Sequence, residues 1–161
     1  MLVVTVVRLS DNKEDLVMGH VIITELGFPI VLENPPMVTV RGQTIPDVNL
    51  KELADAVFAR LIAKPSRLTG DEVKFIRKHL RLRQVDLARV LNMANHSVVS
   101  QWESRGEDTA GMDYNTEVLL RIWMAGKVGQ GDRLVDLLER GLKDLRPSTL
   151  EPLAVTMPRA A

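Results

Sequence analysis

Residues 82–103 read LRQVDLARVLNMANHSVVSQWE, and this stretch predicts two short helices joined by a turn. Leu87 and Ala88 fall on the buried face of the first helix, which we expect from about Gln84 to Leu91. Ala88 is small, so the second helix can approach closely at that point. Asn92 then follows the first helix, where a left-handed residue is needed and asparagine tolerates that conformation.

Asn95 is a favourable N-cap for the second helix, which we expect from about His96 to Glu103. Val99 and Trp102 are three residues apart and turn inward, which leaves four polar side chains on the outer face: His96, Ser97, Ser100 and Gln101. A short helix with polar, non-acidic side chains at its outer N-terminal end suits the major groove of DNA. Such a helix can approach phosphates closely and offer donors and acceptors to base edges.

Further helices are predicted on both sides of this pair. Asp47 or Asn49 can cap a helix that runs to about Ala63, and Thr69 with Glu72 has the spacing of a capping box for the next one. A later helix is expected from about Asp113 to Ala125, before a hinge of three glycines: Gly126, Gly129 and Gly131. Leucines from Leu134 to Leu145 then form an apolar stripe, which either covers the helical core or forms a dimer seam.

The N-terminal part of the chain has the composition of β structure. Short runs rich in β-branched residues are separated by turn signals, and these runs predict an antiparallel meander or a two-stranded extension. The fold class is therefore α+β, with a small antiparallel β region before a helical domain. We divide the chain into a β region, a linking helix, a helix-turn-helix domain, an amphipathic helix and a flexible tail: 1–45, 46–66, 67–126, 127–146 and 147–161.

Charge is distributed unevenly along the chain. The chain as a whole has no net charge, but residues 60–105 hold ten basic and four acidic residues, so this window is +6 and the remainder is −6. Such asymmetry favours a basic functional module inside an acidic carrier. The alternative is a solvated helical face without a function of its own.

Composition limits the other classes of function. Apolar residues make up 45% and charged residues 26%, which is typical of a globular protein rather than a disordered one. The chain has no cysteine, so disulfides, thiolate metal sites and cysteine nucleophiles are excluded, and we expect a cytoplasmic protein. With three scattered histidines we expect no metal and no cofactor. No apolar run is long enough for a membrane span.

The same stretch resembles the helix-turn-helix of the phage-repressor family, also called xenobiotic-response-element regulators. The resemblance rests on an entry motif and an exit motif: Leu82, Gln84, Leu87 and Ala88, then Val99, Ser100, Trp102 and Glu103. Over roughly residues 25–125 the chain also looks like MqsA-type (YgiT-type) antitoxins. That second likeness is carried by residues 25–34, 45–47 and 67–78.

The resemblance implies a role for particular residues. His96, Ser97 and Gln101 match base-reading positions, with Ser100 beside them, and glutamine pairs well with adenine N6 and N7. Gln84 matches the position that clamps a phosphate. We expect the phosphate contacts to come from Gln84 and its polar and basic surroundings: Arg81, Arg83, Gln84, Asn95 and Arg105.

Two departures from the family pattern matter. The turn before the second helix looks one residue longer than usual, which shifts the start of that helix. MqsA-type proteins carry an N-terminal zinc ribbon with cysteines. This chain has none, so zinc does not carry over.

From these residues we expect a homodimeric, sequence-specific regulator, a repressor that binds a palindromic site in double-stranded DNA, with its own promoter as a plausible target. The alternative is an antitoxin that neutralises a partner toxin and regulates its own promoter. We find no assembled catalytic set and do not expect an enzyme.

Overall fold

The structure is a computed structural model that describes residues 20–129 and 152–156, and the chain divides into two units. One unit comprises residues 1–57 and 151–161, and the other residues 58–150. The expected α+β class is confirmed, since strands dominate the described part of the first unit and helices that of the second. The division falls within helix α1, Leu50–Ile62.

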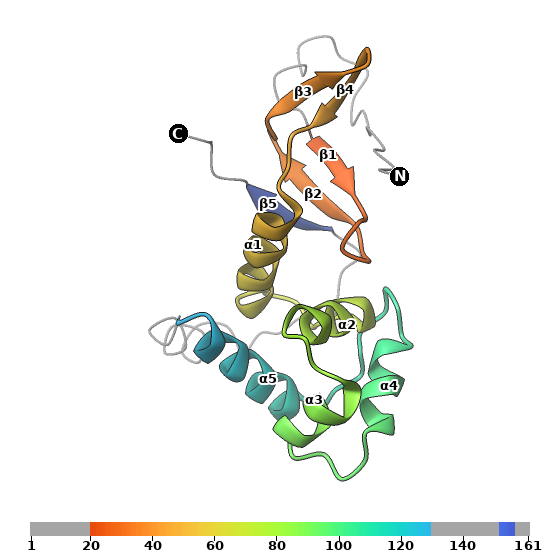
Figure 1. Cartoon of the computed structure of the whole chain (residues 1–161). Helices are drawn as coiled ribbons and strands as arrows, with labels where there is room; N and C mark the ends of the chain where they lie inside the picture. The colour runs from red at the N-terminus through yellow and green to blue at the C-terminus, as the bar shows by residue number, and fades with distance from the viewer. Residues whose placement is uncertain (1–19, 130–151, 157–161) are drawn as a thin grey trace. The chain divides into compact units, whose positions relative to one another are not determined.

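A three-stranded sheet forms the core of the first unit (Figure 1). Strands β1, His20–Ile23, and β2, Ile30–Glu33, are antiparallel, with Val21 opposite Leu32. Residues alternate between the two faces of a strand. Val21, Ile23, Ile30 and Leu32 are accordingly buried, whereas their neighbours in sequence are only half-buried.

The N-terminal strands pair antiparallel as expected, but part of the segment expected to be a flexible tail forms a strand. Leu153–Thr156 forms strand β5, which pairs in parallel with β2 and places Val155 in the core. Its short apolar run gave no sign of its partner, because β2 lies about 120 residues earlier in the chain. The tail therefore contributes a structural strand to the first unit.

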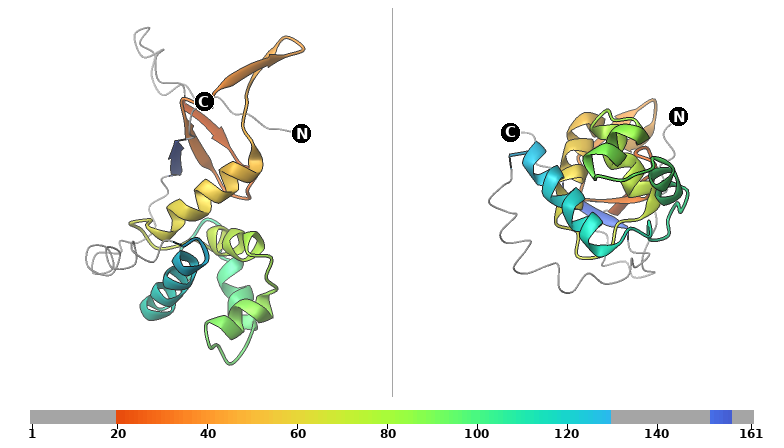
Figure 2. Two further views of the ribbon diagram at one scale, coloured as in Figure 1. Left: turned by 60° about the vertical axis from the view of Figure 1, so that its left-hand side comes forward. Right: turned by 90° about the horizontal axis from the view of Figure 1, so that it is seen from below.

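A separate two-stranded hairpin follows the sheet. Strand β3, Met37–Val40, pairs with β4, Gln43–Pro46, a strand that the sequence analysis did not identify. Arg41 and Gly42 both have positive φ, 50° and 79°, which is the backbone of a two-residue type I′ turn. Figure 1 and the left view of Figure 2 show the hairpin as a ribbon that projects from the three-stranded sheet.

The first two helices begin at the predicted caps. Asn49 Oδ1 accepts the backbone N–H groups of Lys51 and Glu52, at 3.0 and 3.3 Å. Helix α2, Gly70–His79, has the full capping box: Thr69 Oγ1 accepts from Glu72 N at 3.2 Å, and Glu72 Oε2 accepts from Thr69 N at 2.9 Å. Both predicted starts are confirmed.

Helices α3, Gln84–Val90, and α4, Ser97–Glu103, form the predicted pair and lie side by side in both views (Figures 1 and 2). Asn92 is left-handed, with φ 53°, and Met93 N donates to Ala88 O at 2.8 Å to close the end of α3. The expectation for Asn92 is confirmed.

Helix α5, Tyr114–Lys127, completes the described helices. Asp113 caps it, since its carboxylate accepts from Thr116 N at 3.0 Å. Gly126 lies inside α5, so the helix extends past the residue at which the hinge was expected to begin. The leucine stripe and the C-terminal amphipathic helix lie outside the described residues, as do residues 1–19.

The loop after α4 packs directly on the start of α2. Gly70 N donates to Asp108 O at 3.0 Å, and Asp71 N donates to Gly106 O at 2.9 Å. A Cβ atom at Gly70 would lie 2.5 Å from Trp102 O and 2.8 Å from Gly106 N. Only glycine permits this approach, and it fixes the C-terminal end of α4 against α2.

Replacing Gly70 tests this packing. We expect Gly70→Ala to lower the free energy of unfolding by about 1–3 kcal/mol or more, because backbone atoms must move to admit the methyl group. Gly126→Ala is the matched control, since nothing lies within 4 Å of a Cβ there. That helical substitution should raise the free energy of unfolding by up to about 1 kcal/mol. Equal effects in chemical denaturation would contradict the packing.

Candidate functional site

Helix α4 has a buried inner face and an exposed polar outer face. Val99, Trp102 and Glu103 are buried, with exposures of 0, 6 and 9%. On the outer side, three of the four predicted base-reading residues are exposed: His96, Ser100 and Gln101. The fourth, Ser97, is half-buried. The sequence pattern therefore gave the right inner and outer faces.

The start of α4 is set by Asn95. Its Oδ1 atom accepts the backbone N–H of Ser97 at 2.9 Å, so Asn95 acts as the cap although the helix proper begins at Ser97. His96 lies at the junction with helical φ and ψ, −68° and −18°. The side-chain oxygen of Asn95 is thus engaged by the backbone, while its NH2 group carries the donors that a phosphate would accept.

Glu103 is the point where three helices are joined. Arg77 of α2 donates through Nε and Nη2 to the two carboxylate oxygens, at 2.5 and 3.0 Å. Gln84 of α3 donates through Nε2 to Glu103 Oε2 at 2.9 Å. Arg77 Nη1 also donates to Leu82 O at 2.9 Å, which ties in the turn between α2 and α3.

This network defines what Gln84 can do. One hydrogen of its amide NH2 is directed at Glu103, and an amide has two. Gln84 is half-buried, so the second hydrogen can still reach an external acceptor. The position expected to clamp a phosphate is therefore also a structural link between α3 and α4.

Arg83 is held by a neighbouring carboxylate. Its guanidinium donates to both oxygens of Asp86, at 2.9 and 3.0 Å, and Asp86 also accepts the Arg83 backbone N–H at 3.1 Å. These hydrogen bonds and the charges of Arg83 and Arg89 hold the pKa of Asp86 at about 2, below its ordinary value of 3.8. The Arg83 side chain is 77% exposed, so solvent and salt weaken the pair.

Arg81 precedes the helix pair in the sequence and Arg105 follows it. Arg81 is exposed in the turn between α2 and α3 and has a positive φ of 56°. Arg105 follows α4 and lies along the next loop, with Nη2 3.8 Å from the position of a Cβ at Gly111. The expected phosphate-binding residues therefore lie before α3, at its start, before α4 and after α4, and the expected base-reading residues lie on α4 and at its start.

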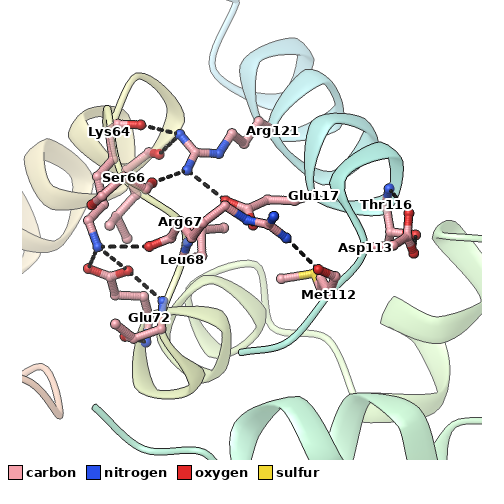
Figure 3. A network of polar contacts seen from close by, with 12 residues as sticks. Lys64, Ser66, Arg67, Leu68, Glu72, Met112, Asp113, Thr116, Glu117 and Arg121 are labelled. Atoms are coloured by element: carbon pink, nitrogen blue, oxygen red, sulfur yellow. Dashed lines mark hydrogen bonds and ion pairs between the residues drawn. The ribbon is translucent and has the colours of Figure 1, made fainter. Parts of the chain in front are cut away.

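A buried polar network accounts for several charges that the sequence analysis counted as available (Figure 3). Arg121, 1% exposed, donates to the carbonyl oxygens of Leu61, Ile62 and Lys64, at the end of α1 and directly after it. It also donates to Glu117 Oε1 at 2.8 Å. Arg121 therefore fastens the end of α1 to α5.

The same network binds Arg67 and Lys64. Arg67 Nε donates to Glu117 Oε2 at 2.6 Å, and Arg67 also donates to Met112 O. Lys64 Nζ lies 2.8 Å from both carboxylate oxygens of Glu72. Sequence spacing could not reveal the Arg67–Glu117 pair, because its members are 50 residues apart.

Three of the ten basic residues counted in the window thus bind carboxylates inside the protein: Lys64, Arg67 and Arg77. Their charges are unavailable to an external partner, so the charge of the window overstates the basic surface. The remaining exposed cations are concentrated on α2, its following turn, α3 and the loop after α4.

Comparisons with family models, curated proteins and solved structures found no match. Within residues 20–129 and 152–156, no cluster of His, Cys, Asp and Glu side chains could hold a metal ion. No helix of that described part is long and apolar enough to cross a membrane.

The Glu103 network makes a prediction about pH. Burial raises the pKa of Glu103. Hydrogen bonds from Arg77 and Gln84 and the nearby charges of Arg77 and Lys74 outweigh burial and hold the pKa below its ordinary value of 4.5. A carboxylate with a depressed pKa stabilises the fold above its unfolded pKa and loses that contribution as pH falls. The free energy of unfolding should therefore decrease below about pH 4.5.

Glu103→Gln tests how much the charge of this carboxylate contributes to stability. At neutral pH we expect it to lower the free energy of unfolding by about 1.5–3 kcal/mol, because charged hydrogen bonds to Arg77 are lost. Its unfolding should also respond less steeply to acid than that of the wild type. Identical acid profiles from chemical denaturation would show that Glu103 is not the titrating group.

Proposed function

We propose that this protein is a sequence-specific double-stranded DNA-binding regulator that acts as a homodimeric repressor, with α4 as its recognition helix. The observation that carries the proposal is the outer face of α4. His96, Ser100 and Gln101 are exposed there, while Val99 and Trp102 anchor the opposite face in the core. A rigid short helix with an outward polar face is the arrangement that reads base edges in the major groove.

The residues around α4 supply the backbone contacts in this proposal. Gln84, Asn95 and Arg105 surround the helix with NH and guanidinium donors, and Arg81 and Arg83 extend them along the preceding turn. Donors to phosphate set the position of the protein on the duplex, whereas base contacts give the sequence preference.

We include a second copy of the protein in the proposal because the recognition helix is short. One helix of seven residues offers few base contacts, and regulators of this size usually read two half-sites about one helical turn apart. The operator would then be palindromic. Repression follows if that site overlaps a promoter, with its own promoter as the first candidate.

Gln101→Ala tests the base-reading role. Selection of bound duplexes from a random pool should give a consensus for the wild type. The variant should lose the preference at one position of each half-site, at a cost of about 1–3 kcal/mol. An unchanged consensus in Gln101→Ala would show that α4 does not read bases as proposed. Glu107→Ala, in the exposed loop after α4, is the control and should keep the consensus.

The β3–β4 hairpin favours a second candidate function, that of an antitoxin which also binds a protein partner. Val38 and Val40 share one side of β3 and are 38 and 48% exposed, with Ile45 opposite Val38 on β4. A lone two-stranded hairpin is only marginally stable in water. A partner that covers this apolar side would stabilise it.

Charge substitutions on the hairpin test this candidate. If the product of a neighbouring gene co-purifies with the chain, Val38→Lys with Val40→Lys should abolish the association, because the new charges would be buried in the complex. Thr39→Lys, on the other side of β3, is the matched control and should leave the complex intact. Equal retention of the partner by all variants would exclude the hairpin as its binding site.

A further inference from the structure

Three exposed basic residues lie on α2 and in the turn after it: Lys74, Lys78 and Arg81. Lys74 and Lys78 are four residues apart and therefore lie on one helix face, and Arg81 is three residues further along. Lys74 and Lys78 are about 6 Å apart along the helix axis, at a rise of ~1.5 Å per residue, and Arg81 lies in the turn that follows. Within the part of the chain that the structure describes, no ion pair or side-chain hydrogen bond engages any of the three.

Folding alone does not explain this row. Like charges four residues apart on a helix repel each other, and Lys74 lies in the middle of α2, where the helix dipole gives little compensation. The dipole favours Lys78 in the last turn and Arg81 directly after the helix, but it leaves the charge of Lys74 uncompensated.

Arg81 also occupies a position that suits glycine. Its φ is 56°, its N–H donates to Lys78 O at 2.9 Å, and Leu82 N donates to Arg77 O at 3.0 Å. This is the left-handed residue that ends a helix, and glycine adopts it without strain. A non-glycine residue held in this region is an observation from which a function can be inferred.

Helix α2, which carries Lys74 and Lys78, lies beside the candidate recognition helix. Arg77, on the same helix between Lys74 and Lys78, binds Glu103 at the C-terminal end of α4. Lys74 is three residues before Arg77 on α2 and is therefore its neighbour on the helix surface.

We propose that Lys74, Lys78 and Arg81 form a phosphate-binding row that tracks the DNA backbone next to the bases facing α4. This inference rests on the proposed DNA-binding function and adds a backbone-binding surface on α2 to it. Its contribution is independent of sequence, because phosphates carry no base information.

The experiment measures the salt dependence of binding by the full chain. Wild type and Lys74→Gln/Lys78→Gln/Arg81→Gly are titrated with a selected duplex and an unrelated duplex at several salt concentrations. Each phosphate contact contributes about 0.9 to the slope of log K against log salt, so the triple variant should lose about 2–3 from the slope. Its affinity for both duplexes should fall by the same factor. Lys51→Gln, an exposed lysine on α1 paired with Asp55, is the matched control and should leave the slope unchanged.

Arg81→Gly alone separates binding from folding. Glycine relieves the left-handed backbone, so the unfolding temperature should rise while the slope decreases by about 0.9. A misfolded variant would not combine a higher unfolding temperature with a smaller salt slope.

The possible failures differ from one another. If the wild type selects a consensus and the triple variant keeps the full slope of log K against log salt, the phosphate-binding role of these three residues is wrong. The proposed function then stands. A loss of affinity for the selected duplex alone would also overturn the row, because phosphate contacts are sequence-independent. If the wild type binds neither duplex at any salt concentration, both proposals fail.

Discussion

The carboxylate of Glu103 is the interaction on which the geometry of the helix pair depends. It is the last residue of α4, it is nearly buried, and it receives donors from Arg77 on α2 and Gln84 on α3. Removing one partner of a buried pair leaves the other charge without compensation, which is strongly destabilising. Because this contact and the Gly70 approach both act at the C-terminal end of α4, the outer face of the helix is presented in one orientation.

Buried ion pairs also join other elements of the helical unit. Arg121 satisfies carbonyl groups at the end of α1 and binds Glu117, and Glu117 in turn receives Arg67 Nε and the backbone N–H of Leu68. These contacts connect α1, the segment before α2 and α5. They also show why the number of basic residues in the sequence overestimates the basic surface. Several of these cations are paired with carboxylates inside the protein.

The features that the sequence predicted well are local ones. The Thr69–Glu72 capping box, the Asn49 cap, the left-handed Asn92 and the inward Val99 and Trp102 depend on residues within a few positions of each other. Short-range rules of spacing and backbone preference are sufficient for them.

The features that it missed depend on distant partners. Strand β5 exists because its register matches β2, and Glu117 accepts from Arg67 because the fold brings α5 to the segment before α2. Neither partner can be found from periodicity. In the candidate site, the exposure of His96, Ser100 and Gln101 was predictable, but the engagement of Gln84 by Glu103 and of Arg83 by Asp86 was not.

The most direct test of the central claim places a reporter on the outer face of α4. The chain has no cysteine, so Ser100→Cys gives a unique thiol to which a DNA-cleaving iron chelate can be attached. If α4 lies in the major groove, cleavage of the selected duplex will be confined to a few nucleotides in each half-site. The same chelate at Lys51→Cys on α1 should give no such focus. Diffuse or absent cleavage from position 100, on a duplex that the labelled protein still binds, would contradict α4 as the recognition helix.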